Sequence, residues 1–270
     1  MGGDTPRSAE PEAVVLDLPD LAEVRHRFDP GRLVVFDDGG TFSGRAAIVV
    51  QTSLPEWTGT GTVGEVLAGF GYAPVGTAYQ RLRVSAPDGV PDRPGSAADG
   101  PPQVVVCFGG SDPGDVLGRI GPALLDDPDW VAELVVGADY RGIAGSWSPP
   151  VLRDPPDLPE RIAAADLVVV GAGTMKFEAA CVGRPAVILA VADDQLPGAP
   201  IYAQTRAALY CGDGRTIDPA VVRAAVAGLV ADEPGRRSMG RRAAELIDGQ
   251  GAARIAAAVL AMATAVILAQ

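Results

Sequence analysis

Short runs of hydrophobic residues alternate with helical stretches through the second half of the chain. The runs predict strands at residues 104–108, 134–136, 167–170 and 186–191. The stretches between and after them predict helices at 116–125, 158–165, 175–182, 202–207, 221–230, 236–247 and 252–268. Continuous apolar strands that alternate with helices are typical of a parallel sheet with helices on both faces. We therefore expect a complete α/β domain over residues 103–270.

The first 85 residues predict a smaller α/β domain, with strands at 13–18, 33–36 and 46–51 and a helix at 21–28. Residues 86–102 are rich in proline and glycine, which disfavour both helix and strand, so we expect a linker there. Open parallel sheets that bind nucleotides have about five or six strands. We therefore expect the domain over residues 1–85 to be truncated, with about three strands missing.

Charge and composition argue against several classes of function. The formal net charge is −12 and no basic segment is interleaved with aromatic residues, which argues against nucleic-acid binding. The N-terminal residues lack the basic start and apolar run of a signal peptide. The apolar segment 255–270 is shorter than the roughly 20 residues that span a bilayer. We expect a cytoplasmic protein with no membrane partner, in which this segment is a buried helix.

Two predicted strands end in glycine turns that lead into helices, within VVVCFGGSD (104–112) and DLVVVGAGTMKFE (166–178). Glycine lets a ligand approach the backbone closely, and the start of a helix offers N–H groups to an anion. We expect a nucleotide diphosphate between the two turns, bound by Gly109, Gly110, Ser111, Gly173, Thr174, Met175, Lys176 and Glu178. Glu178 is the candidate for the ribose hydroxyls, and Lys176 for a phosphate charge.

Each of these residues also has a structural interpretation. Asp112 and Thr174 are candidate helix caps, and Pro113 suits the first position of a helix. Glu178 and Lys176 would then be ordinary solvated side chains. We keep both interpretations open.

Three further polar residues, Asp193, Asp194 and Gln195, directly follow the strand at 186–191, and we expect them on the sugar side of a ligand. Asp37 and Asp38 follow another strand and precede two glycines, which favours a turn over a general base or a weak metal site. Asp38 and Asp194 are the candidate catalytic carboxylates. We expect His26, between two arginines, to be exposed and inert, and we expect neither metal nor cofactor.

Four segments carry a resemblance to a known family: FGGSD, PPDLPERIAAADLVVVGAGT, FEAACVGRPAVILAVADDQ and LIDGQGAARI. They resemble the C-terminal domain of the UDP-sugar hydrolase of pseudaminic acid biosynthesis, over nearly all of residues 103–260. That family has a GT-B fold and is similar to the N-acetylglucosaminyltransferase of peptidoglycan synthesis. The resemblance implies that Thr174 and its neighbours hold the diphosphate, Glu178 the ribose and residues 193–195 the sugar. His26 does not match the family's catalytic histidine.

We expect an enzyme that cleaves the anomeric C–O bond of a UDP-sugar, by hydrolysis or by glycosyl transfer. One alternative is a binding subunit without catalysis, completed by a partner chain that supplies the missing strands. The other alternative is a scaffold whose C-terminal helix does not cross onto the N-terminal domain and instead pairs two copies in a homodimer.

Overall fold

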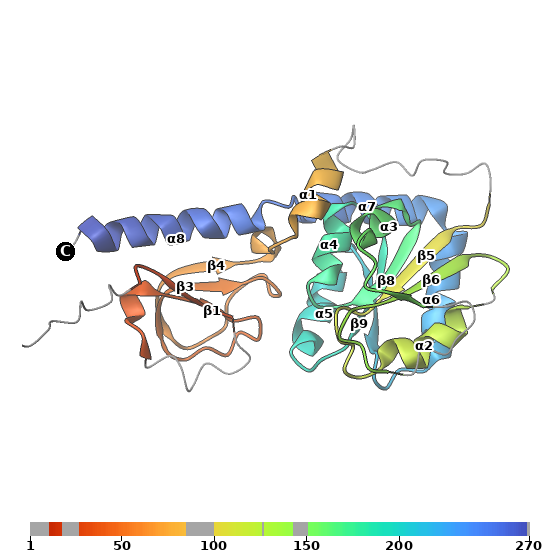
Figure 1. Ribbon diagram of the computed structural model, residues 1–270, viewed down its shortest axis with the longest axis horizontal. Helices are drawn as coiled ribbons and strands as arrows, with labels where there is room; N and C mark the ends of the chain where they lie inside the picture. Colours follow the sequence, from red (N-terminus) through yellow and green to blue (C-terminus); the bar gives the residue numbers. More distant parts are fainter. Residues whose placement is uncertain (1–10, 18–26, 85–99, 126, 143–150, 269–270) are drawn as a thin grey trace, which may run out of the picture. The chain divides into compact units, whose positions relative to one another are not determined.

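The computed structural model describes residues 11–17, 27–84, 100–125, 127–142 and 151–268. It contains two compact units, each with one parallel sheet (Figure 1). The small unit is Met1–Tyr72 with Ala253–Gln270, and the large unit is Ala73–Ala252. Most of the expected linker and of the expected helix at 21–28, including His26, falls outside the described residues.

The large unit contains a six-stranded parallel sheet in the order β10-β9-β8-β5-β6-β7. Its strands are β5 (Gln103–Cys107), β6 (Val131–Val136), β7 (Leu152–Arg153), β8 (Leu167–Gly171), β9 (Ala186–Ala190) and β10 (Leu209–Asp213). The prediction of a parallel sheet from continuous apolar runs is confirmed, since β8 and β9 are buried at every position. β7 and β10 were not predicted, because one is two residues long and the other is only partly buried.

Helices cover both faces of this sheet. They are α1 (Thr77–Val84), α2 (Val116–Leu124), α3 (Leu158–Ala164), α4 (Met175–Cys181), α5 (Gln195–Gln204), α6 (Pro219–Ala231) and α7 (Glu233–Leu246). Alternate residues of the strands form one core with α2 and α6, in which Ile120 and Val222 are fully buried. Helix α4 packs against β8 and β9, and its Phe177 ring meets Tyr202 of α5 edge to face, with centroids 5.7 Å apart.

The small unit contains a four-stranded parallel sheet in the order β1-β2-β3-β4. Its strands are β1 (Val14–Leu16), β2 (Leu33–Phe36), β3 (Arg45–Gln51) and β4 (Thr62–Ala68). The first three agree with the predicted strands. β4 was missed because Gly64 and Glu65 interrupt its apolar pattern, and as an edge strand it is largely exposed.

The two faces of the small sheet are covered differently. On one face, Leu33, Val35 and Val49 pack with aromatic residues of the loops, among them Phe42 and Trp57. On the other face, Val34, Ile48, Val50 and Leu67 pack against helix α8 (Gly251–Leu268), which lies along the sheet in Figure 1. The inward residues of α8 are Ile255, Ala258, Val259 and Met262.

This packing corrects two expectations. We expected helix α8 to belong to the domain over residues 103–270, and the scaffold alternative assumes that the helix does not cross onto the N-terminal domain. The helix instead contacts the N-terminal sheet directly. The helix was also expected to be buried, but only one face is. The helical stretch Glu233–Leu268 includes an apolar window long enough to cross a membrane by length and composition, and 11% of that window is buried. Because the inward face of α8 completes the core of a sheet, we interpret it as a packing helix.

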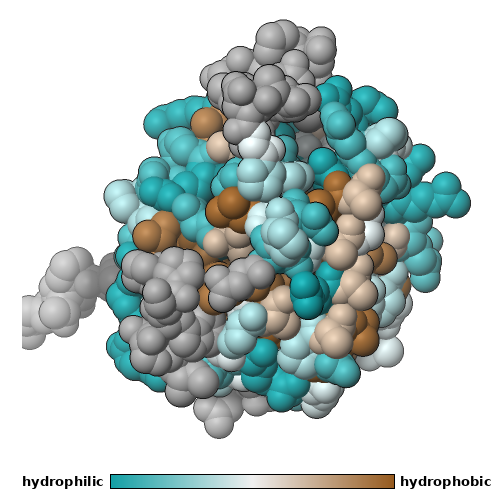
Figure 2. Space-filling model, turned by 90° about the vertical axis from the view of Figure 1, so that its right-hand side faces the viewer, coloured by the Kyte–Doolittle hydropathy of each residue, from teal (hydrophilic) through white to brown (hydrophobic). Residues whose placement is uncertain are grey.

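Outside α8, the described surface carries scattered exposed hydrophobic residues. Figure 2 shows one face of the molecule, on which hydrophobic residues are interspersed among a mostly hydrophilic surround. Single exposed hydrophobic residues such as Val131 and Val221 are normal on a folded protein.

Candidate functional site

The two predicted glycine turns lie side by side. β5 and β8 are neighbours in the sheet, and Cys107 pairs with Val170 at their carboxyl ends. From β5 the chain first adds β6 and β7 on one side and then returns to add β8, β9 and β10 on the other. The boundary between β5 and β8 is therefore the point at which the strand order reverses. Open α/β sheets bind their ligands at this point, beyond the carboxyl ends of the strands.

The turn after β5 presents backbone to open space. Gly109 has a φ of 92°, a conformation that favours glycine. A Cβ atom on Gly109 or on Gly110 would meet nothing within 4 Å. In contrast, a Cβ atom on Gly137, in the turn after β6, would overlap the backbone of Gly110. One side of the Gly110 turn is thus packed against the protein, while the other side is open, and the next residue, Ser111, is exposed.

Asp112 holds this turn to helix α2. Its buried carboxylate accepts hydrogen bonds from the backbone N–H groups of Val116 (3.0 Å) and Leu117 (2.8 Å). The expected capping role of Asp112 is confirmed. Pro113 is not at the first helical position, because α2 begins only at Val116, after a turn in which Asp115 has a left-handed φ of 47°.

The turn after β8 contains Gly173 and Thr174 and leads into α4. Thr174 is exposed and occupies the N-cap position, but its side chain makes no capping hydrogen bond, so the capping interpretation of Thr174 is wrong. Met175 is buried. Gly173 faces Gln195 of the next turn, since a Cβ atom on Gly173 would lie 3.1 Å from the Gln195 Nε2.

Lys176 points into the protein and is not a solvated lysine. Its side chain is 2% exposed, and its Nζ donates to the carbonyl oxygens of Ala172 and Gly173, the latter at 3.1 Å. The Nζ also lies 4.0 Å from the centroid of the Phe177 ring. Lys176 therefore braces the β8 turn from the inner side, and this placement does not support a direct phosphate contact.

Glu178 is partly buried one turn into α4, so the interpretation as a fully solvated glutamate is also wrong. The hydroxyl of Tyr79, on α1, donates a hydrogen bond to its carboxylate. Burial raises the pKa of Glu178 above the usual glutamate value, and the bond from Tyr79 opposes that rise. Burial also raises the pKa of the Cys107 thiol, at the end of β5, to about 11.

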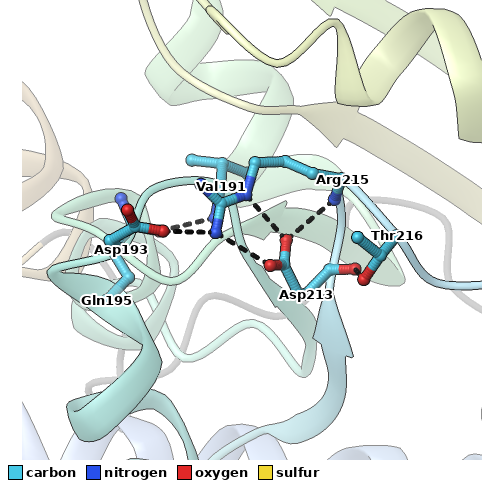
Figure 3. A network of polar contacts seen from close by, with 6 residues as sticks. All are labelled: Val191, Asp193, Gln195, Asp213, Arg215 and Thr216. Atoms are coloured by element: carbon cyan, nitrogen blue, oxygen red, sulfur yellow. Dashed lines mark hydrogen bonds and ion pairs between the residues drawn. The ribbon is translucent and has the colours of Figure 1, made fainter.

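A polar network that the sequence did not reveal joins the turns after β9 and β10. Figure 3 shows the guanidinium group of Arg215 between Asp193 and Asp213. It donates to Asp213 at 2.9 and 2.8 Å and to Asp193 at 2.6 Å. The Arg215 side chain also crosses Gly114 in the loop after β5, where a Cβ atom would lie 2.9 Å from its Cγ. The Asp-Gly-Arg spacing at 213–215 was the available signal.

The remaining candidates differ in their surroundings. Gln195 accepts a hydrogen bond from the Val191 N–H, which fixes the turn that carries Asp193 and Asp194. Asp194 is exposed, and among the described residues no ion pair involves it.

Asp37 and Asp38 form a turn in the small unit, as expected. The buried carboxylate of Asp37 accepts hydrogen bonds from the N–H groups of Thr41 and Phe42 and from Trp57 Nε1. Asp38 is exposed and accepts a hydrogen bond from the Thr52 hydroxyl at 2.9 Å. No cluster of three or more metal-ligating side chains occurs within the described ranges.

Comparisons with known proteins agree with this architecture. No protein-family model matches the chain. The structure is similar to MurG of Acinetobacter baumannii, with a TM-score of 0.57 and 16% identity over 92% of this chain and 73% of that one. It is also similar to the spinosyn rhamnosyltransferase SpnG in complex with thymidine diphosphate, with a TM-score of 0.56 and 18% identity over 83% and 72% of the two chains.

In sequence, the chain is 29% identical over 93 residues to the spore coat polysaccharide biosynthesis protein SpsG of Bacillus subtilis (strain 168). The match covers 34% of this chain and 27% of SpsG. The chain has a GT-B-like fold, because it contains two parallel sheets with helices and its structure is similar to MurG and SpnG.

Proposed function

We propose that the protein binds a nucleotide sugar through its diphosphate at the boundary between β5 and β8, and cleaves the anomeric C–O bond by hydrolysis or glycosyl transfer. The observation that carries this proposal is the pair of adjacent glycine turns at the point of strand reversal. The open space over Gly109 and Gly110 supports a ligand that approaches the backbone of this turn closely.

The surrounding residues supply the other contacts of such a ligand. Glu178 is a carboxylate one helical turn from Thr174 and can accept hydrogen bonds from two ribose hydroxyls. Gln195 and Asp193, on the turn after β9, are our candidates for contacts with the sugar. Backbone N–H groups aimed at the diphosphate would stabilise the charge that this leaving group gains as the glycosidic bond breaks.

The reaction also needs a base to activate water or an acceptor hydroxyl. Asp194 is the first candidate, because it belongs to the same unit as the glycine turns and has no ion-pair partner among the described residues. Asp38 is the second candidate, in the small unit. The resemblance to the hydrolase of pseudaminic acid biosynthesis favours hydrolysis, and the partial similarity to SpsG, a protein of spore coat polysaccharide biosynthesis, is in keeping with a carbohydrate substrate.

A titration with UDP by isothermal calorimetry tests the binding step. We expect saturable binding, and we expect Glu178→Ala to weaken it by about 1–3 kcal/mol because the ribose hydroxyls lose a charged acceptor. Glu245→Ala, on the exposed surface of α7, is the matched control and should bind like the wild type. An unchanged affinity in Glu178→Ala would remove Glu178 from the site, and no binding at millimolar UDP would reject the proposal.

Incubation with UDP-N-acetylglucosamine, with and without candidate acceptors, tests the chemical step through the release of UDP. A non-catalytic binding subunit is the second candidate function, since no residue here matches the family's catalytic histidine. UDP binding without UDP release from any nucleotide sugar tried would favour that second function.

A further inference from the structure

Two arginines converge on one carbonyl oxygen beside the β5 glycine turn. Arg141 follows β6, and Arg153 is the last residue of β7. The Nη1 atom of Arg141 donates to the Tyr140 carbonyl oxygen at 3.2 Å, and the Nη1 atom of Arg153 donates to the same oxygen at 3.1 Å. Arg153 also donates to the Gly137 carbonyl oxygen at 3.3 Å, and its guanidinium carbon lies 5.9 Å from the centroid of the Tyr140 ring.

These two positive charges have no negative partner in the described part of the chain. Neither arginine forms an ion pair with a described carboxylate, although the exposed Asp139 lies two residues before Arg141 and the exposed Asp154 directly follows Arg153. The sequence from Tyr140 to Arg153 contains no acidic residue. Like charges this close repel each other unless an anion lies near both, and this pair occurs in a protein with a net charge of −12.

The arginine pair is next to the open glycine turn. Gly137, whose carbonyl oxygen accepts from Arg153, packs against the backbone of Gly110, and the Asp139 N–H donates to the Gly110 carbonyl oxygen at 3.2 Å. The turns after β5 and β6 are thus joined by direct contacts. An anion over Gly109 and Gly110 would be within reach of long arginine side chains on this neighbouring turn.

Arg215 is a contrasting arginine on the same edge of the sheet. It is held between two carboxylates, those of Asp193 and Asp213, which together exceed its charge. Arg215 is therefore suited to fixing the turns after β9 and β10, whereas Arg141 and Arg153 keep their charge available for a ligand.

We propose that Arg141 and Arg153 form a phosphate subsite that binds a phosphoryl group of the ligand beside Gly110. The inference rests on the proposed nucleotide site, and it adds two side chains to which neither the motifs nor the resemblance assigned a role. Guanidinium groups bind phosphoryl oxygens through charge-assisted hydrogen bonds, and their fixed fork suits this geometry.

The test compares inorganic pyrophosphate, UDP and uridine as ligands in calorimetric titrations at low salt. The variants are Arg141→Gln, Arg153→Gln and the double variant, with Arg241→Gln on the exposed face of α7 as the control for loss of one positive charge. We expect the double variant to bind pyrophosphate and UDP roughly tenfold more weakly or worse, with uridine affinity unchanged. The Arg141→Lys/Arg153→Lys variant should recover part of the affinity, and the wild-type affinity should fall steeply with salt.

The outcomes separate this inference from the proposed function. Pyrophosphate binding that depends on the arginine pair, without tighter binding of UDP, would support the subsite and reject the nucleotide ligand. UDP binding with equal affinity in the wild type and the double variant would overturn the subsite and leave the nucleotide site standing. A parallel loss of uridine binding in the double variant would also overturn it, because the substitutions would then act through the shape of the site.

Discussion

The hydroxyl of Tyr79 donates a hydrogen bond to the carboxylate of Glu178, which joins helix α1 to helix α4 within the large unit. Two effects act on the pKa of Glu178: burial raises it, and the bond from Tyr79 to the ionised form lowers it. Burial and the nearby Glu178 charge raise the pKa of Tyr79, so the tyrosine remains a donor.

This relationship predicts a specific pH dependence. The pKa of Glu178 in the folded protein is above its usual value of 4.5. Between pH 4.5 and this raised pKa, the folded state therefore binds more protons than the unfolded state. The free energy of unfolding should therefore fall as pH rises through the raised pKa. Glu178→Gln should remove this slope in urea titrations made over a pH series, and Glu245→Gln should keep it.

Tyr79→Phe should raise the pKa of Glu178 further, because the carboxylate loses a donor. If Glu178 must be ionised to accept from ribose, the pH at which UDP affinity declines on acidification will be higher in Tyr79→Phe than in the wild type. Calorimetric titrations across the same pH series measure this midpoint. An unshifted midpoint would mean that Tyr79 has only a packing role.

Two glycine-to-alanine variants should behave oppositely. Gly110→Ala adds a methyl group in open space, so the protein should keep its melting temperature, while UDP affinity should decrease because the methyl group occupies the proposed ligand space. Gly137→Ala forces a methyl group against the Gly110 backbone and should cost about 1–3 kcal/mol of stability. Thermal unfolding and UDP titration of both variants check this; full UDP affinity in a folded Gly110→Ala protein would place the ligand elsewhere.

Asp37 should be a major contributor to the stability of the small unit. Its carboxylate accepts hydrogen bonds from two backbone N–H groups and from Trp57, and all three donors lose their acceptor in Asp37→Ala. We expect a loss of about 2–4 kcal/mol. Asp38→Ala, next to it but exposed, should cost less than about 1 kcal/mol. Urea unfolding followed by tryptophan fluorescence compares the two, and equal losses would contradict the assigned role.

Lys176 offers a direct measure of local opening. It is the only lysine in the sequence, and its side chain is 2% exposed. An amine-reactive reagent should therefore modify Lys176 quickly in protein unfolded by urea, and in the folded protein only when α4 or the β8 turn opens. Peptide mass spectrometry over time measures both rates. If Lys176 reacts equally fast in the folded and the unfolded protein, its buried placement is wrong.

The large unit was more predictable than the small one for a physical reason. Strands such as β8 and β9 are buried on both faces, so their sequences are continuous apolar runs that stand out in the pattern. β4 and β10 are partly exposed and carry polar residues, and an exposed strand resembles a loop in sequence. Helix α8 is apolar on all sides, so its pattern could not indicate which sheet it covers.

In the candidate site, too, some features could be predicted from the sequence and others could not. The glycine turns were predictable because each directly follows a buried strand, and neighbouring strands bring them together. The inward direction of the Lys176 side chain could not be predicted, because it depends on the space between α4 and α5. Arg141 lies in the connection after β6, and Arg153 lies at the end of β7. The two arginines are separated in sequence, and the pairing of β6 with β7 brings both side chains to the Tyr140 carbonyl oxygen.

The packing of α8 on the small sheet has a consequence for biosynthesis. The strands of that sheet are synthesised well before the helix that covers one of their faces, because all strands of the large sheet lie between them in the chain. Until translation passes residue 262, Val34, Ile48, Val50 and Leu67 have no partner from α8 and are open to contact with other nascent chains or with chaperones. That face of the small sheet can therefore be covered only after α8 has been made, whereas every strand of the large sheet precedes α6 in the chain.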